Sequence, residues 1–322
     1  MDSMQLQYLT YFVAVAQTRH FTRAAERVNV SQPALSKQIA TLERELGATL
    51  FSRARGNITL TAAGEALLPL AQRILADVDT ATREVQELAQ LRRGRVRLGA
   101  TPSVCTGLLP TVLRDFHREY PGIQLVVQET GSGDLVRELS AGALDLALVI
   151  PAQGGPAEEG ALVITPVLVE ELIVASSPAA AAPEPRSPSG GLRLSDLAGL
   201  PLVMFRHGYD LRTFTMTACQ RAGFDPTIAI EGGEMDAVLG FVAVGLGVAV
   251  VPATVVANRT DLRVTPFAQP SPSRVVALAH RRDVRLPRAA AELRATLLSY
   301  LDTEAAAGTL PPRTRRYTAV PA

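Results

Sequence analysis

Cysteine and lysine are scarce in this chain of 322 residues, and both shortages exclude whole classes of protein. Two cysteines, Cys105 and Cys219, cannot build a disulfide framework or a cysteine-rich metal site, which favours a protein of the reducing cytosol. Lys37 is the only lysine, so arginine supplies nearly all of the 32 basic groups; arginine binds phosphate as lysine does and adds a bidentate fork. Against 31 acidic residues the formal net charge is +1, which by itself predicts neither nucleic-acid nor membrane binding.

Targeting and catalytic motifs are missing too. Residues 1–7 contain Asp2 and no basic group, so the apolar stretch behind them is not a signal peptide. The uncharged window 237–257 is long enough to cross a bilayer, but its three glycines and Pro252 favour a buried helix, a turn and a buried strand. The sequence lacks a nucleophile elbow, a P-loop and a dinucleotide-binding glycine motif, and its four histidines have no metal-ligand spacing. We therefore expect a soluble cytoplasmic protein that is not an enzyme and holds no cofactor or metal.

The first 47 residues have the apolar periodicity of three short helices. The second helix is expected to have Thr22 as its N-cap, and the third to have Ser31 as its cap, Pro33 in its first turn and Gly47 at its end. Because a turn of three residues joins these two helices and small residues lie at their contact, the segment predicts a helix-turn-helix. The stripes of the first two helices are Leu6, Leu9, Val13 and Ala16, then Phe21, Ala24, Ala25 and Val28.

A short hairpin with basic residues at its tip is expected next, from strands at 49–52 and 58–60, which makes the motif a winged one. Residues 1–60 carry seven basic and four acidic groups, a local balance of +3 that favours DNA. The third helix offers short polar and basic side chains near its N-terminus, where base edges and phosphates lie. A three-helix bundle with a solvated outer face is the alternative. The expected DNA contacts are Gln32 and Ser36 to base edges, Pro33 to a thymine methyl, Lys37 to a phosphate or guanine, and Arg53 and Arg55 in the wing.

A long helix is predicted from Ala62 to about Leu91, with Thr61 as its N-cap. Its apolar residues alternate spacings of four and three over three heptads, which predicts a two-stranded coiled coil. At 1.5 Å per residue this helix is roughly 45 Å long, and Pro69 should bend its first turns. The run 92–95 then marks a hinge. The expected dimerisation seam is Leu67, Ala71, Ile74, Val78, Ala81, Val85 and Leu88.

From residue 96 onward, strands and helices alternate and the order repeats, which predicts two α/β halves with parallel strands. The first half has strands at 96–100, 123–128 and 144–150 and helices at 108–116 and 134–141. The second has strands at 202–205, 228–230 and 248–251 and helices at 211–222 and 235–244. Segments at 167–175 and near Pro266 are expected to cross between the halves, and strand 275–279 and helix 288–301 to return to the first. The Ala-, Pro- and Ser-rich segment 178–191 is predicted to be a surface insertion, and the chain after Thr303 to be frayed.

The predicted fold class is therefore α plus α/β, in four segments. A winged helix-turn-helix domain covers 1–61, a linker and dimerisation helix 62–92, an α/β domain 95–303 and a tail 304–322. Within the α/β domain, the first subdomain is expected to contain about 95–168 and 274–303, and the second about 169–273.

A long ordered set of residues in the N-terminal region resembles the DNA-binding signature of LysR-type transcriptional regulators. It comprises Phe21-Thr22-Arg23-Ala24-Ala25, the run from Ser31 to Ile39, Leu42-Glu43, Leu46-Gly47, Leu50-Phe51-Ser52-Arg53 and Leu60-Thr61-Ala62-Ala63-Gly64. Gly142 to Ala147 and Gly245 to Ala249 also match the effector-domain pattern of that family. The resemblance runs from about Leu6 to Leu301. It implies a linker helix followed by a periplasmic-binding-protein-like effector domain of two subdomains.

The resemblance also implies partners and a mechanism. A homotetramer, built as a dimer of dimers, would bind interrupted dyad sites on promoter DNA in the cytoplasm, at the nucleoid. A small molecule between the two subdomains would change the shape of the tetramer, relax the bent DNA and alter contact with RNA polymerase. The energetics agree, because bending DNA costs several kcal/mol and a ligand acts only through unequal affinity for two states.

Effector contacts are expected beyond the carboxyl ends of the strands, near helix N-termini. Thr101 and Ser103 could instead only cap the helix that follows them. Because helix N-termini and Arg206 favour a negative group, we expect a small carboxylate with Phe205 over its apolar part; Arg206 as a solvated loop residue is the alternative. The expected effector residues are Thr101, Pro102, Ser103, Thr130, Gly131, Pro151, Phe205, Arg206, Gly247 and Val248.

Two other functions compete with ligand-controlled transcription. Peroxide-sensing members of the similar family use a cysteine pair, and Cys105 lies at a predicted helix start, where a thiolate is favoured. Nothing in the sequence brings Cys219 close to it, so an inert buried thiol is the alternative. A solute-binding α/β protein is the other rival, although no signal peptide supports it.

Overall fold

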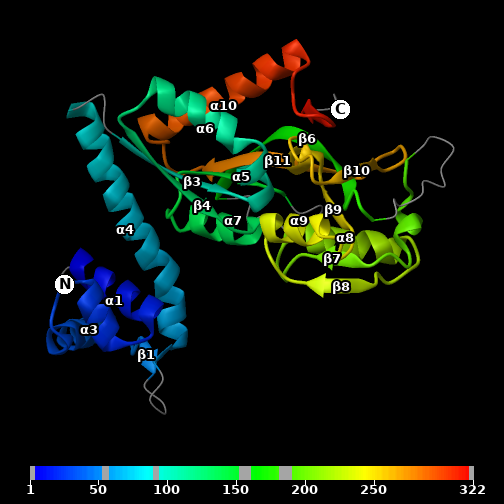
Figure 1. Cartoon of the computed structure of the whole chain (residues 1–322). Coiled ribbons are helices and arrows are strands. Elements are labelled where there is room, and N and C mark those ends of the chain that lie inside the picture. The colour runs from blue at the N-terminus through cyan, green and yellow to red at the C-terminus, as the bar shows by residue number, and fades with distance from the viewer. Residues whose placement is uncertain (1–3, 53–57, 90–93, 152–160, 181–190, 319–322) are drawn as a thin grey trace. The chain divides into compact units, whose positions relative to one another are not determined.

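The computed structural model describes residues 4–52, 58–89, 94–151, 161–180 and 191–318, with only the backbone of 83–89. Contacts divide the chain into two compact units, whose main parts are residues 1–91 and the chain from residue 92 onward. The first unit is helical and the second is built around sheets (Figure 1). No helix in the described ranges is long and apolar enough to cross a membrane.

The N-terminal unit is a winged helix-turn-helix. Helices α1 (Leu6–Thr18), α2 (Phe21–Arg27) and α3 (Gln32–Leu46) precede a small hairpin of β1 (Phe51–Ser52) and β2 (Thr59–Leu60), in which Phe51 pairs with Leu60. Phe12, Leu35 and Ile39 are almost fully buried and form the centre of its core with Leu42 and Leu50. The apolar periodicity of the sequence thus predicted the three helices and the buried faces of α2 and α3. The predicted stripe of α1 was wrong apart from Leu9: Leu6 is exposed, Val13 and Ala16 are half-buried, and α1 buries Phe12 and Val15 instead.

The helix caps follow the predictions with one exception. Ser31 accepts a hydrogen bond from the Ala34 N–H at 3.4 Å, and Gly47 ends α3 at φ 67°, a conformation that favours glycine. The prediction for Thr22 was wrong, because the cap of α2 is His20, whose Nδ1 accepts from the N–H groups of Thr22 and Arg23. An imidazole nitrogen replaces the side-chain oxygen usual at this position.

The C-terminal unit begins with lobe I, a sheet with helices on both faces. Its strands β3 (Gly94–Ala100), β4 (Ile123–Glu129) and β5 (Leu146–Val149) are parallel, and β11 (Ser273–Arg281) joins them antiparallel to β5. Alternate residues of β5 face opposite layers: Leu146 and Leu148 pack with α5 (Pro102–Gly107), α6 (Leu109–Glu119) and α10 (Arg288–Ala307), while Ala147 and Val149 pack with α7 (Ser132–Ser140).

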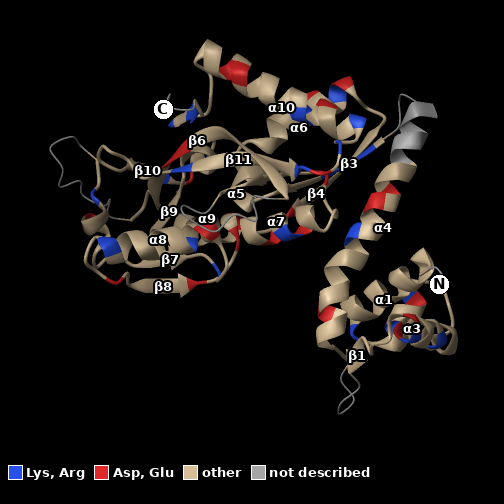
Figure 2. Cartoon of the chain, turned by 180° about the vertical axis from the view of Figure 1, so that it is seen from behind, with Lys and Arg blue, Asp and Glu red and all other residues tan. Residues whose placement is uncertain are grey.

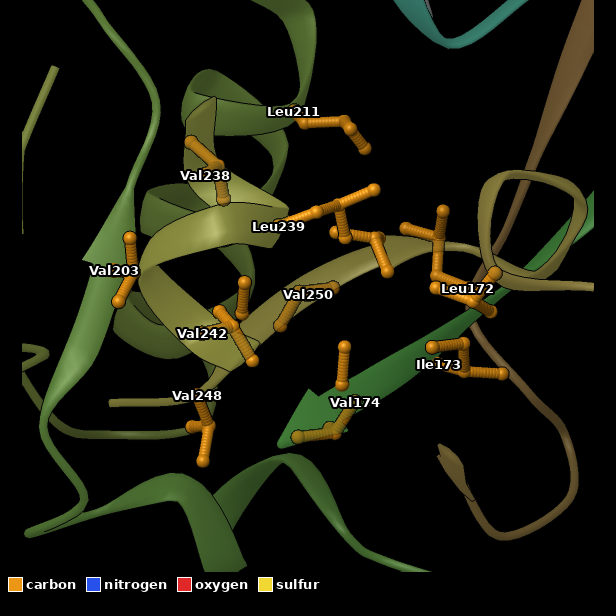
Figure 3. Packing of buried hydrophobic residues seen from close by; sticks show 14 of the residues in the cluster. Leu172, Ile173, Val174, Val203, Leu211, Val238, Leu239, Val242, Val248 and Val250 are labelled. Atoms are coloured by element: carbon orange, nitrogen blue, oxygen red, sulfur yellow. The ribbon is translucent and has the colours of Figure 1, made fainter. Parts of the chain in front are cut away.

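One long strand, β6 (Leu162–Ser176), connects lobe I with lobe II. Its first part pairs with β11, and its residues 172–176 pair with β9 (Ala249–Pro252) and β10 (Arg263–Pro266). Lobe II adds β7 (Leu202–Met204), β8 (Ile228–Glu231), α8 (Asp210–Arg221), α9 (Met235–Ala243) and the 3₁₀ turns η3 (Leu194–Leu197) and η4 (Ala253–Val256). In Figure 3, Leu239 and Val242 of α9 lie on the side of the helix that faces Val250 and the β6 residues of the lobe II core.

The prediction of a frayed tail was wrong. Helix α10 continues to Ala307, and β12 (Thr314–Arg316) pairs antiparallel with residues 168–170 of β6. An ion pair of 2.9 Å from Arg313 to Glu171 and a hydrogen bond of 2.6 Å from Arg316 Nη1 to the Val167 carbonyl hold this strand in place. Most of the predicted insertion, residues 181–190, lies outside the described residues.

Candidate DNA interface and effector site

The outer face of α3 presents the residues predicted to read DNA. Gln32, Pro33 and Lys37 are exposed, while Leu35 on the opposite face is fully buried. Gln32 Nε2 donates a hydrogen bond of 3.0 Å to Ser36 Oγ, so the two groups expected to contact base edges lie side by side. This bond leaves the carbonyl oxygen and the second N–H of Gln32, and the O–H of Ser36, free to contact a base edge.

Glu43 fixes the wing against α3. Its Oε1 accepts hydrogen bonds from the backbone N–H groups of Leu50 at 2.7 Å and Phe51 at 3.3 Å. These contacts give a structural role to Glu43, for which the sequence analysis predicted none. Arg53 and Arg55, the predicted wing contacts, lie outside the described residues.

The predicted dimerisation seam on α4 (Ala62–Ala89) is partly wrong. Ala71 is fully buried and Leu67 packs beside it, both in the core of the winged helix-turn-helix, because α4 closes that core. Ile74 and Val78 remain 36% and 41% exposed, so the stripe open to another chain begins about one turn after Ala71. Ala81 is exposed as well, and the side chains of Val85 and Leu88 lie outside the described part.

Thr101 and Ser103 lie at the start of α5, directly after β3, and both are buried. The alternative that Thr101 only caps the helix is wrong, because in the described chain its side chain makes no capping hydrogen bond. Its Oγ1 lies 3.5 Å from Ser103 Oγ, and Pro102 is buried between them. The two hydroxyls thus lie buried at the carboxyl end of β3, and their contact with an effector stays a prediction.

A buried ion pair continues this polar cluster. Arg274 of β11 donates to Glu170 of β6 from Nε at 2.9 Å and from Nη2 at 2.7 Å. The same Nη2 donates to Ser103 Oγ at 2.6 Å, and Thr254 Oγ1 of η4 donates to Glu170 Oε1 at 2.7 Å. The network therefore connects α5 of lobe I to η4 of lobe II. Sequence reasoning missed it, because Glu170 and Arg274 are separated by 104 positions and each lies within an apolar strand.

Tyr209 supplies the second group that the sequence did not reveal. It is 2% exposed, and its ring stacks on Phe205 at a centroid distance of 4.6 Å. Its hydroxyl is buried without a hydrogen-bond partner among the described residues. Burial raises the pKa of Tyr209, while the positive charge of Arg274 and an interaction with the Ser103 hydroxyl, which lies within reach but does not form a hydrogen bond of good geometry, oppose that rise. A buried donor without a partner costs free energy, so it favours a ligand that accepts its hydrogen bond.

Ser132, which lies after β4, connects the end of β5 with lobe II. Ser132 Oγ donates to Asp210 Oδ2 at 2.7 Å and accepts from the Ile150 N–H at 2.9 Å. Burial raises the pKa of Asp210, and the hydrogen bond from Ser132 works against that rise. Gly131 is buried beside this contact, and Thr130 donates to Asp134 at 3.2 Å. Both predicted residues thus lie at the interlobe side of β4.

Four predicted effector residues have other environments. Arg206 forms an ion pair with Glu234, which removes the free positive charge expected there. Val248 is buried in the lobe II core and its N–H donates to the Pro201 carbonyl, while a Cβ at Gly247 would collide with that carbonyl oxygen. Gly247 and Val248 therefore serve the packing of lobe II. Pro151 is exposed after β5.

Charges of both signs are mixed on several helices of the C-terminal unit (Figure 2). On α7, and around α6 and α10, acidic and basic residues occur together (Figure 2). In the described ranges, no group of three or more His, Cys, Asp or Glu side chains is placed to hold a metal ion.

The environment of Cys105 does not suit a redox-sensing cysteine. Burial, followed by the negative charge of Glu129, raises its pKa to about 12, and its Sγ lies 3.8 Å from the Ala100 carbonyl oxygen. Cys219 is fully buried, and both thiols are free. The helix start does not produce the thiolate that a sensor needs.

We expect Cys105 to react slowly with iodoacetamide. At pH 8 a pKa of about 12 leaves a thiolate fraction on the order of 10⁻⁴, about a thousandfold below an ordinary thiol. The rate should rise about tenfold per pH unit, because the thiolate is the reacting form. Mass spectrometry of the labelled chain measures it, with Cys105→Ser reporting the background from Cys219. Labelling at the rate of free glutathione would restore the redox alternative.

Both units match models of one family. Residues 6–65 match the bacterial regulatory helix-turn-helix protein of the lysR family, and residues 89–302 match the LysR substrate binding domain. The chain belongs to the LysR family of transcriptional regulators. It is a DNA-binding transcriptional regulator with an effector-binding domain, as the resemblance in the sequence predicted.

Relatives and solved structures cover nearly the same length. The transcriptional dual regulator GltC of Bacillus subtilis (strain 168) is 33% identical over 258 residues, which are 80% of this chain and 83% of GltC. A probable hydrogen peroxide-inducible genes activator of Streptomyces viridosporus is 34% identical over 283 residues, 86% of this chain and 88% of the relative. Full-length CbnR complexed with its target DNA is similar in structure, with a TM-score of 0.65, 26% identity and coverage of 94% of this chain and 100% of CbnR. The matches thus extend over both the helix-turn-helix region and the substrate-binding region of this LysR-family chain.

Proposed function

We propose that this LysR-family regulator reads promoter DNA with Gln32 and Ser36 and responds to a small molecule bound between its two lobes. The observation that carries the effector site is the buried hydroxyl of Tyr209, which lies near Ser103 and Arg274 and forms no hydrogen bond of good geometry within the described chain. Thr101, Ser103 and Gly131 come from lobe I, and Phe205 and Tyr209 from lobe II, so a ligand that contacts both sets would bias their relative position.

We further propose that the exposed stripe of α4 holds a dimer and that two dimers form a tetramer on interrupted dyad sites in the cytoplasm, where RNA polymerase is contacted. Ile74 and Val78 support the dimer, because exposed apolar side chains at this spacing suit a helix–helix seam. The carboxylate expected as effector has lost its main support, because Glu234 already pairs with Arg206.

Replacing Gln32 or Ser36 with alanine should weaken binding to the cognate promoter site by about 1–3 kcal/mol and change binding to random DNA much less. Because the two side chains share a hydrogen bond, the loss in the double variant should differ from the sum of the single losses. Fluorescence anisotropy at fixed salt measures both affinities. Thr10→Ala, which removes an exposed hydroxyl on α1, is the matched control. Equal losses on cognate and random DNA would contradict base reading.

A further inference from the structure

Glu170 places a carboxylate in the protein interior, at the point where β6 passes from lobe I to lobe II. Its side chain is 2% exposed, and that of its partner Arg274 is 7% exposed. Both carboxylate oxygens are held: Oε2 by two nitrogens of Arg274, and Oε1 by Thr254 Oγ1. These partners come from β11 and η4, so the carboxylate connects three separate segments of the chain.

The donors around Glu170 would also bind a carboxylate that belongs to a ligand. A guanidinium and a hydroxyl are the usual protein donors to a carboxylate, and such charge-assisted bonds are short. Arg274 is oriented in turn by its bond of 2.6 Å to Ser103 Oγ, a residue of the proposed effector site. The effector site and the Glu170 carboxylate thus share one guanidinium.

Because Arg274 is already paired with Glu170, it does not give the effector site a net positive charge. Glu170 neutralises Arg274, Glu234 pairs with Arg206, and the carboxyl of Asp210 adds a further acidic group at the interlobe contact. An anion placed there would lose its hydration without gaining a net positive charge, which is costly. Two donors remain available: Tyr209 Oη, which has only the Ser103 hydroxyl within reach and no hydrogen bond of good geometry, and Arg274 Nη1, since the described contacts of Arg274 use Nε and Nη2.

We propose that Arg274 and Thr254 form a carboxylate subsite that the chain's own Glu170 occupies, and that this internal carboxylate restricts the effector to an uncharged molecule with acceptor oxygens for Tyr209 and Arg274. Amides, ketones, esters and polyols belong to this class. The selectivity part rests on the proposed effector function, whereas the subsite stands on the contacts of Glu170 alone.

Chemical rescue tests the subsite. Glu170→Ala removes a group of the size of acetate and leaves Arg274 without a counter-charge. We expect sodium acetate to raise the melting temperature of this variant by several degrees over sodium chloride at equal ionic strength, in a saturable manner. The wild type and the matched variant Glu171→Ala, which loses an exposed partner of Arg313 on the neighbouring position, should respond equally little to acetate. An acetate response of Glu170→Ala no larger than that of Glu171→Ala would overturn the subsite.

Refolding provides the readout if Glu170→Ala does not fold in chloride. Dilution from denaturant into acetate should then recover its helical circular dichroism, and dilution into chloride should not. Recovery that is the same in both salts, or absent from both, would overturn the subsite.

Matched pairs of an amide and its carboxylate test the selectivity. We expect melting-temperature shifts in the wild type only from uncharged members, and in Glu170→Gln from the anionic members as well, because Arg274 then has no counter-charge. A carboxylate that stabilises the wild type more than its amide would overturn the selectivity. If acetate rescues Glu170→Ala while no compound of either charge shifts the wild type or alters its DNA binding, the subsite stands and the proposed effector function fails.

Discussion

Aspartate at both position 74 and position 78 is expected to convert the regulator into monomers. Ile74 and Val78 are exposed on one stripe of α4, so the substitutions should leave the fold of the chain intact. In a homodimer each aspartate would be buried against its own copy, and an uncompensated buried charge costs about 3–5 kcal/mol. A loss of about 3 kcal/mol weakens association more than a hundredfold.

Sedimentation velocity measures this change, with circular dichroism to verify the fold. Thr80→Asp introduces a charge on α4 two residues after Val78, on the other side of the helix from the stripe, and should keep the oligomer of the wild type. If Ile74→Asp/Val78→Asp sediments as the wild type does, α4 is not the interface.

Removing the positive charge of Arg274 is expected to destabilise the C-terminal unit strongly. Arg274→Met leaves Glu170 buried without its partner, which costs about 3–5 kcal/mol. At roughly 2–4 °C per kcal/mol for a unit of this size, the melting temperature should fall by about 10 °C. The double variant Glu170→Leu/Arg274→Met should recover most of the loss, because apolar residues replace a buried ion pair at little cost.

The control is a partly exposed ion pair, formed by Glu171, which follows Glu170 on β6. Arg313→Met breaks the ion pair between Arg313 and Glu171, both of which are partly exposed. The loss of unfolding free energy should be less than about 1 kcal/mol. Equal melting temperatures for Arg274→Met and Arg313→Met would show that the buried pair does not hold the lobes, and would remove the reason for placing the site there.

Local patterns predicted the elements of this chain well, because hydrophobic periodicity acts within one element. The stripe Leu35, Ile39 and Leu42 identified the buried face of α3, and the strand and helix order identified both lobes. The same reasoning placed Thr101 and Ser103 at the interlobe end of β3, because strand ends in an open α/β sheet meet at one edge.

Errors arose where partners are distant in sequence. Ala71 has the spacing of a coiled-coil seam, yet it is buried in the core of helices far earlier in the chain. Strand β12 was expected to fray, since three residues with two arginines have no local strand pattern and gain order only from β6. Arg206 suggested an anion site because its partner Glu234 lies 28 positions away, and the buried Arg274 remained hidden within a strand.

Footprinting of the full-length protein on its promoter, with and without each compound of the paired panel, tests the central claim most directly. We predict that a compound which raises the melting temperature of the wild type also changes its pattern of protected DNA. Tyr209→Phe and Thr101→Val should each abolish both effects while the affinity for DNA without ligand stays unchanged. A compound that alters the footprint of the wild type and of both variants to the same extent would show that the effector binds elsewhere, and would contradict the site between the lobes.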